Sequence, residues 1–190
     1  VLNRYLSGDL QAFDIIENEI GINHRLLSNQ FYRAAELLGE KHYYYRNLKS
    51  KGLYFESYSV YNLDISSDSA EVLDLKLMKQ AVALDSTASY IWLNLCWKDP
   101  SLDSVQFYIR KLEELVPNWP IFHFWVDNVL SDGYKPDPEA SLMRFQKALA
   151  CDSTFFPAWF SSQIPLKQLG QTEAAESALH YVAPVGEKAE

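Results

Sequence analysis

Apolar side chains recur along most of this chain at three- and four-residue intervals, which is the spacing of amphipathic helices. The pattern predicts a short helix over 9–19 that ends at Gly21, and a second helix from an Asn23 cap to Gly39. Residues 40–52 fit no single element. Beyond them the pattern predicts four helix pairs: 53–63 with 69–84, 88–98 with 101–116, 121–131 with 138–151, and 156–168 with 171–182. The expected fold class is therefore all-α.

Residue types near the predicted ends indicate how these helices begin and stop. The expected N-caps are Asp68 or Ser69, Ser101 and Thr172. Pro100 and Pro138 stand where a first helical turn needs no backbone N–H. Pro165 is expected to interrupt the helix over 156–168, because a proline inside a helix removes a hydrogen bond.

Two eight-residue segments, 80–87 (QAVALDST) and 147–154 (KALACDST), align without gaps, and a tryptophan follows each at the same distance. With two further rings the series becomes Tyr58, Trp92, Trp125 and Trp159, at intervals of 34, 33 and 34 residues. Two antiparallel helices of roughly 12–15 residues with two short turns take up about 34 residues. The interval therefore predicts stacked helix hairpins, with the rings packed in a shared core.

This pattern resembles the tetratricopeptide repeat family over about residues 53–184. The likeness rests on an Ala-Leu/Val-x-x-Asp stretch after each second helix, an aromatic residue that opens the next first helix, and Gly170 in the final turn. In the last repeat, the family's preferred places hold Trp159, Leu166, Gly170, Ala175, Leu179 and Val182. Glu114, Pro136 and Pro165 depart from the family pattern.

The resemblance implies a right-handed superhelix of antiparallel helix pairs. Residues 53–184 would supply three to four pairs, 1–52 would form an N-terminal helical cap packed on the array, and 185–190 would be a tail. It also implies a concave groove lined by the first helix of each pair. The groove places hold Tyr90, Leu93, Asn94 and Trp97, then His123, Val126, Asp127 and Leu130, and finally Phe160, Ser161 and Ile164.

An apolar, aromatic groove of this kind fits an amphipathic helix or an extended hydrophobic peptide. Family members that hold a partner's C-terminal carboxylate use a Lys/Arg/Asn clamp in the groove, and this sequence lacks it. The leading hypothesis is a protein–protein interaction scaffold. Two alternatives stay open: an accessory or regulatory repeat domain of a larger enzyme or sensor, and a small-ligand site between the groove and the N-terminal helices. Whether the helices within 9–39 fill the groove also stays open.

Sequence motifs that carry catalysis are absent. The chain has no phosphate-binding glycine loop, dinucleotide fingerprint, His-Glu-x-x-His or nucleophile elbow. His24, His42, His123 and His180 are scattered, without Cys, Asp or Glu at metal-ligand spacing. Cys96 and Cys151 lie in apolar patterns and are expected to be small buried side chains. We expect no enzyme activity, no cofactor and no metal site.

The formal net charge of −8 is concentrated in residues 65–190, which have 17 acidic against 10 basic side chains. Such a surface repels phosphate backbones, so nucleic acid is not an expected partner. One basic stretch, 41–51, also holds three tyrosines. It has two interpretations: a nucleic-acid patch of stacking rings and cations, or a helix whose tyrosines pack inward while its charges face water. We favour the second.

The last predicted helix has Ala174, Ala178, Leu179 and Val182 at helical spacing, and no polar capping helix follows in the sequence. This predicts a homodimer or a neighbouring domain at that face. No run of 18 apolar residues occurs, so no membrane span is expected. The chain opens at Val1 without a Met or a signal-peptide pattern, which suggests a processed protein or a fragment. The compartment is not readable; a cytoplasmic location is favoured and an extracytoplasmic one stays open.

Overall fold

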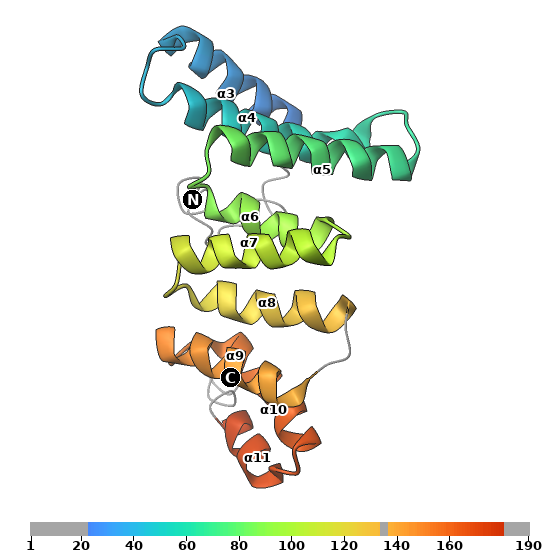
Figure 1. Cartoon of the computed structure of the whole chain (residues 1–190), viewed down its shortest axis with the longest axis vertical. Coiled ribbons are helices and arrows are strands. Elements are labelled where there is room, and N and C mark those ends of the chain that lie inside the picture. The colour runs from blue at the N-terminus through green and yellow to red at the C-terminus, as the bar shows by residue number, and fades with distance from the viewer. Residues whose placement is uncertain (1–22, 134–136, 181–190) are drawn as a thin grey trace, which may run out of the picture. The chain divides into compact units, whose positions relative to one another are not determined.

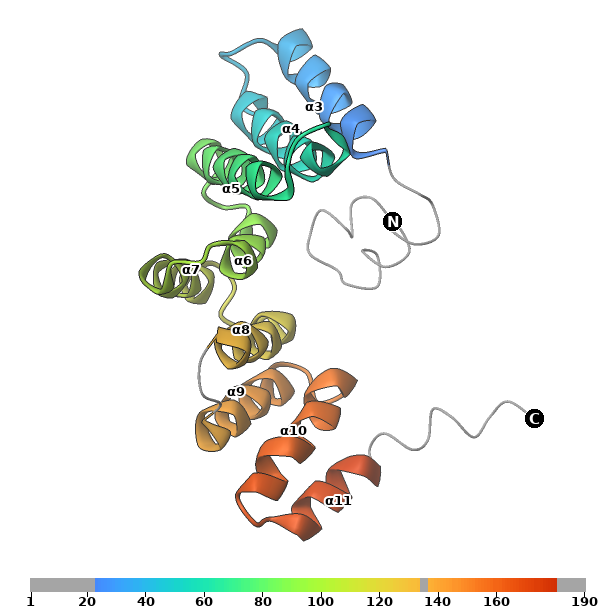
Figure 2. The same ribbon diagram turned by 90° about the vertical axis from the view of Figure 1, so that its right-hand side faces the viewer.

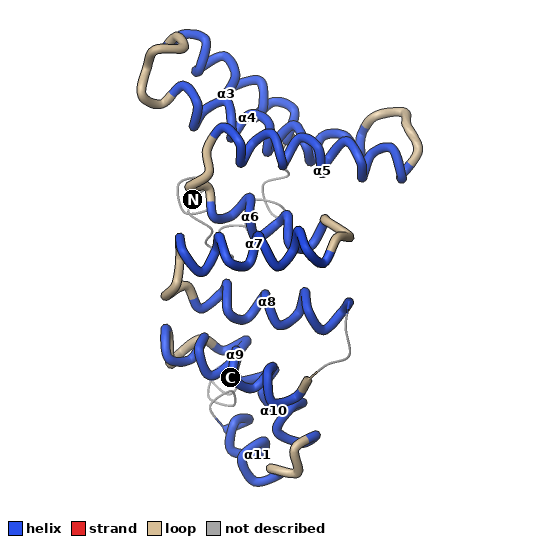
Figure 3. Tube along the Cα trace, in the orientation of Figure 1, coloured by secondary structure: helices blue, strands red, loops and turns tan. Residues whose placement is uncertain are grey.

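The computed structural model describes residues 23–133 and 137–180, and every regular element in these ranges is a helix, without a strand (Figure 3). The predicted all-α class is confirmed. The predicted helix over 9–19 and the tail over 185–190 lie outside the described residues.

The chain divides into two compact units, 1–115 and 116–190. The first holds α3 (His24–Leu38), α4 (Tyr45–Ser59), the 3₁₀ helix η2 (Val60–Asn62), α5 (Ser67–Leu84), α6 (Ser89–Lys98) and α7 (Leu102–Leu115). The second holds α8 (Pro120–Gly133), α9 (Pro138–Cys151), α10 (Phe156–Gln168) and α11 (Thr172–His180). Within each unit every α-helix packs against the next one in the chain (Figures 1 and 2).

The start of the first unit differs from the prediction. α3 begins where it was expected, because the Asn23 side chain accepts the Leu26 N–H at 2.9 Å, and it ends before Gly39, whose φ is 77°. α4 begins at Tyr45 and runs without a break to Ser59, so the expected boundary between 52 and 53 lies inside one helix. Gly52 sits in the middle of α4, where it weakens the helical pattern that the sequence shows.

Several helix ends were predicted correctly and others were not. The Ser101 hydroxyl accepts the Ser104 N–H at 3.4 Å, as expected of a cap. Pro100 was expected in a first helical turn, but α7 begins only at Leu102, so this proline lies before the helix. Pro138 is the first residue of α9, as predicted. α5 is capped by Ser66, whose hydroxyl accepts the Ser69 N–H, and not by Asp68 or Ser69. α11 starts at Thr172 itself, which is therefore not the cap.

α10 passes through Pro165 and ends only at Gln168, so the expected interruption does not occur. Its end is closed by two hydrogen bonds, from Gln171 N–H to the Leu166 carbonyl at 2.8 Å and from Gly170 N–H to the Lys167 carbonyl at 3.1 Å. Gly170 has a φ of 74°, a conformation that glycine adopts without strain, and this arrangement is the Schellman motif. The glycine of the final turn is thus required by the backbone.

The two aligned segments fold into the same turn. Asp85 follows α5 and Asp152 follows α9, and each carboxylate accepts both the N–H and the hydroxyl of the threonine two residues later at 2.6–3.0 Å. In both segments the Asp N–H donates at 3.0 Å to the carbonyl of a fully buried alanine, Ala81 or Ala148. The alignment made from the sequence is confirmed at the level of single hydrogen bonds.

A ring closes each of these turns from the following helix. The Trp92 indole donates to the Ser86 carbonyl and the Trp159 indole to the Ser153 carbonyl, both at 2.9 Å and both from the fourth residue of a helix. In α8 the fourth residue is His123, whose Nε2 lies 2.8 Å from the Pro117 carbonyl, again six residues back. This ring position, and not Trp125, is the equivalent one.

The predicted ring series is therefore half correct. Trp92 and Trp159 are equivalent, whereas Trp125 is the sixth residue of α8 and Tyr58 lies one residue before the end of α4. The reason is that the pairs differ in length: from Ser89 to Pro120 is 31 positions, and from Pro120 to Phe156 is 36. A constant interval of 33 or 34 hides this difference.

A buried carboxylate ties α5, α6 and α7 together in the first unit. Asp99 follows α6 and accepts from the Tyr108 hydroxyl at 2.7 Å, the Ser101 N–H at 3.0 Å and the Lys79 ammonium at 2.8 Å. Burial alone would raise the pKa of Asp99, but these donors stabilise the charged form and hold the pKa below its usual value. Asp99 therefore stabilises the fold when it is ionised.

Replacing Trp92 tests the turn-closing role. Trp92 is buried against Tyr108 and Phe107, so Trp92→Ala should lower the free energy of unfolding by about 3–5 kcal/mol. Trp92→Phe keeps a ring but loses the donor, and should cost about 1 kcal/mol from the lost hydrogen bond, plus any packing loss. Urea unfolding followed by circular dichroism measures both; a near-neutral Trp92→Ala would contradict the assignment.

The Asp99 network predicts a pH dependence. Asp99→Asn should lower the free energy of unfolding at pH 7 by about 1–2 kcal/mol, a figure discounted because Lys79 is partly exposed. A depressed folded-state pKa contributes stability above the unfolded value of about 3.9, and this is lost as the pH falls through the folded value. The difference between wild type and Asp99→Asn should thus be constant above about pH 5 and shrink below about pH 4. Asp64→Asn, on an exposed loop, is the control; a pH-independent difference would refute the network.

Candidate functional site

The eleven residues expected in the groove belong to both units. In the first unit they lie on α6. Tyr90 is largely buried and meets the edge of the Tyr54 ring at a centroid distance of 4.9 Å, and burial raises the pKa of its hydroxyl well above the usual value. Trp97 is 39% exposed. Of these α6 residues, only Trp97 presents a substantial apolar area to solvent.

Asn94 links two helices through hydrogen bonds and is not free to face a groove. Its Oδ1 accepts the Tyr58 hydroxyl at 2.8 Å, and its Nδ2 donates to the Tyr90 carbonyl at 2.8 Å and to the Tyr54 hydroxyl at 3.4 Å. The side chain thus joins α4 to α6 and uses both ends of its amide. An amide that is already satisfied on both sides has little capacity left for a ligand.

Near Asn94 lies a buried ion pair between Asp74 and Lys98, which was not predicted from the sequence. The Asp74 carboxylate on α5 is almost fully buried, and its Oδ2 accepts from Lys98 and, at 2.8 Å, from the Tyr61 hydroxyl. The Lys98 ammonium also lies over the rings of Tyr58 and Tyr61, at 5.2 and 5.4 Å from their centroids. Burial, followed by the hydrogen bond to and the charge of Asp74, raises the pKa of Tyr61 to about 12.

The α8 residues of the second unit are also engaged within their unit. His123 closes the turn at Pro117, as described above. Asp127 is buried and forms an ion pair with Arg144 of α9 at 3.0 Å. Leu130 lies within α8, but the structure does not describe its side chain. The structure therefore assigns His123 and Asp127 to holding α8 in place.

Two of the three α10 residues are different, because they are exposed, whereas Ser161 is half-buried. Phe160 is 55% exposed and Ile164 65% exposed, and one turn earlier Phe156 is 44% exposed. The Phe156 and Phe160 rings stack with centroids 6.1 Å apart and an angle of 14° between their planes. Positions 156, 160 and 164 share one side of the helix, and we call them the α10 stripe. Phe160 and Ile164 were predicted from the sequence, and Phe156 was not, although it lies four residues before Phe160.

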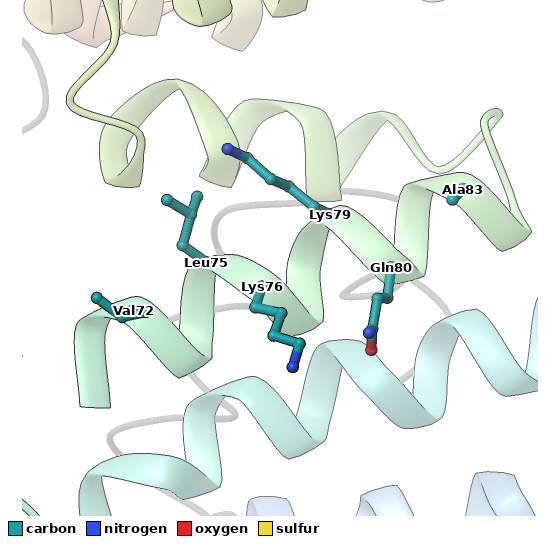
Figure 4. Close-up of a pocket in the computed structure, with 6 residues that line it drawn as sticks. All are labelled: Val72, Leu75, Lys76, Lys79, Gln80 and Ala83. Carbon is teal, nitrogen blue, oxygen red and sulfur yellow. The ribbon is translucent and has the colours of Figure 1, made fainter. Parts of the chain in front are cut away.

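A second surface lies on α5 and was not predicted. Figure 4 shows the six residues along this helix that line a groove of about 440 Å³: Val72, Leu75, Lys76, Lys79, Gln80 and Ala83. Lys76 and Gln80 extend to one side of the helix, and Lys79 extends to the other, where its ammonium meets Asp99. The centre of the groove is apolar and its sides carry lysines.

The basic stretch over 41–51 does not follow the favoured interpretation throughout. Tyr43 is 87% exposed and Tyr44 56% exposed, and their rings contact each other at a centroid distance of 4.9 Å in the turn between α3 and α4. Only Tyr45 is half-buried. The prediction that all three tyrosines pack inward is wrong for two of them, because they lie in a turn and not on a packed helix face.

The face predicted on the last helix is also different. Ala178 is buried within the second unit together with Ala175, whereas Ala174 is exposed. The side chain of Leu179 and all of Val182 lie outside the described residues. The described part of α11 therefore presents Ala174 as its one exposed alanine and does not expose the full apolar face that the sequence suggested.

The last features to consider in the described residues are the cysteines, possible metal ligands and membrane-spanning helices. Cys96 is buried, and burial raises the pKa of its thiol to about 12, while Cys151 is only half-buried. Within the described ranges, no three His, Cys, Asp or Glu side chains come together in an arrangement that could hold a metal ion. In the same ranges no helix is both long and apolar enough to cross a membrane.

Comparison with known proteins adds no family. No protein-family model matches the chain, and no curated protein matches it either.

The variant Asn94→Asp tests whether the Asn94 side chain stabilises the packing of α4 on α6 or is available to contact a ligand. A carboxylate would face the Tyr90 carbonyl without a donor, so the free energy of unfolding should fall by about 1–3 kcal/mol at pH 7. Asn118→Asp, the same change at an exposed position of the turn before α8, should change it by much less. Thermal or urea unfolding measures both variants. An Asn94→Asp chain as stable as wild type would show that the amide contacts do not matter to the fold.

Proposed function

We propose that this chain is a non-catalytic protein-interaction module that docks a partner on the α10 stripe. The observation that carries the proposal is the run of Phe156, Phe160 and Ile164 along one side of a helix, each more than two-fifths exposed. Large apolar side chains occur singly on most protein surfaces, but three in line on one helix are typical of an interaction surface.

The stripe has the dimensions of a helix-docking site. From 156 to 164 the helix rises about 12 Å, or a little over two turns. Burying one Phe or Ile side chain contributes roughly 1.5–3 kcal/mol, so the three together could support a micromolar complex after the costs of association. Phe156 and Phe160 are already stacked on each other, so little conformational freedom remains to be lost there on binding.

The charge of the surroundings favours a basic partner. The α10 helix has no acidic residue, but α11, which packs against it, exposes Glu173 and Glu176. The whole of 65–190 carries 17 acidic against 10 basic side chains. We therefore propose that the partner is an amphipathic helix with apolar residues on one face and Lys or Arg on the other.

We also propose that the helix pairs are of the tetratricopeptide type and build a right-handed superhelix, with α3 and the start of α4 as its N-terminal cap. The support is local: the same Asp–Thr turn and the same ring-to-carbonyl contact recur at residues 85–92 and 152–159. A role as an accessory domain of a larger enzyme or sensor is compatible with the same surface.

A synthetic Leu/Lys helix of about five turns, labelled with a fluorophore, tests the docking proposal. We expect binding to the wild-type chain by fluorescence anisotropy, weakened by roughly tenfold to a hundredfold in the variant Phe160→Ser with Ile164→Ser. Met143→Ser, an equally exposed apolar site on α9, is the matched control and should bind like wild type.

Two results would contradict the proposal. The first is equal weakening in the Met143→Ser control, which would mean non-specific adhesion. The second is a free chain that sediments as a dimer and becomes monomeric in the α10 variant, which would assign the stripe to a second copy. A Leu/Glu helix with the same apolar face should bind more weakly than the Leu/Lys helix, because the acidic surface repels it.

A further inference from the structure

A cleft between α3 and α4 in the first unit combines rings with fixed charges of both signs. Its volume is about 890 Å³, which lies within the range of small-ligand sites. The lining residues are Asn29, Tyr32, Arg33 and Glu36 of α3, Tyr45, Lys49, Leu53 and Glu56 of α4, and Leu84 at the end of α5. This cleft lies in a different unit from the α10 stripe and is independent of it.

Tyr32 lines the cleft from α3, and its ring packs directly on the backbone of α4 at Gly52. A Cβ at Gly52 would lie 2.6 Å from the Tyr32 ring, so only glycine allows the ring to lie this close to α4. Glycine inside a helix costs about 1 kcal/mol relative to alanine. The close approach of Tyr32 gives that glycine a structural reason.

Two residues of opposite charge contact Tyr32. The Tyr32 hydroxyl donates to Oε2 of Glu56 at 2.5 Å, and the Lys49 ammonium lies 5.0 Å from the centroid of the ring. The second ring beside Lys49 is Tyr45, at 5.8 Å. Burial, followed by the hydrogen bond to Glu56, raises the pKa of Tyr32 well above its usual value, so the hydroxyl remains a donor at neutral pH.

Lys49 and Glu56 are not paired with each other or with other charges in the described part of the chain. The ion pairs found there join Lys79 to Asp99, Lys98 to Asp74, Lys111 to Glu114 and Arg144 to Asp127. Arg33 and Glu36, also in the cleft, are exposed, of opposite sign and one turn apart on α3, so their fields largely cancel. Lys49 and Glu56 are both half-buried, and their charges therefore dominate the electrostatic field in the cleft.

The separation of the two charges indicates the size of the ligand. Lys49 and Glu56 are seven positions apart on one helix, about 10 Å along its axis, and their contacts with the same Tyr32 ring keep the two charged groups within about that distance. A ligand of one sign would be attracted by one group and repelled by the other. A zwitterion with charges about 10 Å apart satisfies both, and three residues of an extended peptide span that length.

We propose that the cleft between α3 and α4 binds a short zwitterionic peptide of about three residues, with its carboxylate at Lys49 and its ammonium at Glu56. The side chains of such a peptide would contact Leu53, Leu84 and the Tyr45 ring. The site would recognise length and free ends more than sequence, since both charge contacts are made to the peptide termini.

The test uses the tripeptide Ala-Leu-Ala, titrated into the ¹⁵N-labelled full chain at pH 7 and followed by NMR shifts of α3 and α4 amides. N-acetylation or C-amidation of the peptide should each weaken binding by roughly tenfold or more, because each removes one charged contact. Lys49→Gln and Glu56→Gln should do the same. Lys147→Gln and Glu113→Gln, on exposed positions of other helices, are the matched controls and should bind like wild type.

The decisive comparison pairs each peptide end with its residue. Acetylation should cost nothing further in Glu56→Gln, and amidation nothing further in Lys49→Gln, because in each case the partner group is already gone. The proposal is overturned if Ala-Leu-Ala causes no shifts in α3 and α4 at millimolar concentration, or if the acetylated and amidated forms bind as tightly as the free peptide. Failure here leaves the α10 stripe untouched, since that surface is probed by a different ligand.

Discussion

The turns that lead into α6, α8 and α10 depend on one contact. A ring at the fourth residue of each helix lies within hydrogen-bond distance of a carbonyl six residues earlier. Trp92 and Trp159 make it in the same way, and His123 makes it with an imidazole. It gives a loop carbonyl a hydrogen-bond partner within the chain, and it ties the start of the next helix to the turn before it. The Asp–Thr contacts at Asp85 and Asp152 close two of the same turns from the other side.

Once the turns are fixed, polar contacts between helices decide which surfaces remain for partners. On α6 and α8, the side chains expected to face a ligand are used inside the protein: Asn94 joins α4 to α6, and Asp127 is paired with Arg144. Buried groups of this kind are costly to leave unsatisfied, so they are poor candidates for binding another molecule. On α10 the corresponding places hold Phe160 and Ile164, which have no polar contact to make and stay exposed. The surface that we propose for a partner is therefore narrower than a groove along all the first helices of the pairs.

The fold class and the local turns could be predicted because they depend on near neighbours. The Asn23 cap, the Gly170 turn and the two Asp–Thr turns are each set within a few residues, and the sequence shows them directly. The middle ring could not be found, because it changes from Trp to His and the helix pairs differ in length. Asp74 with Lys98 and Tyr32 over Gly52 could not be found either, because each contact joins residues at least 20 positions apart. Phe156 was not predicted because it is not one of the groove places that the family resemblance implies.

If the α10 stripe is free to dock a partner, solvent reaches the side chain of Ile164, and its methyl groups report on the stripe most directly. A soluble paramagnetic agent broadens NMR signals of groups that solvent reaches. In the free chain we expect strong broadening of the Ile164 methyl signals, close to that of the exposed Met143 methyl, and little broadening for the buried Ile91. A signal of Ile164 protected like that of Ile91 would mean that the stripe is already covered, and the proposal that it docks a partner would be wrong.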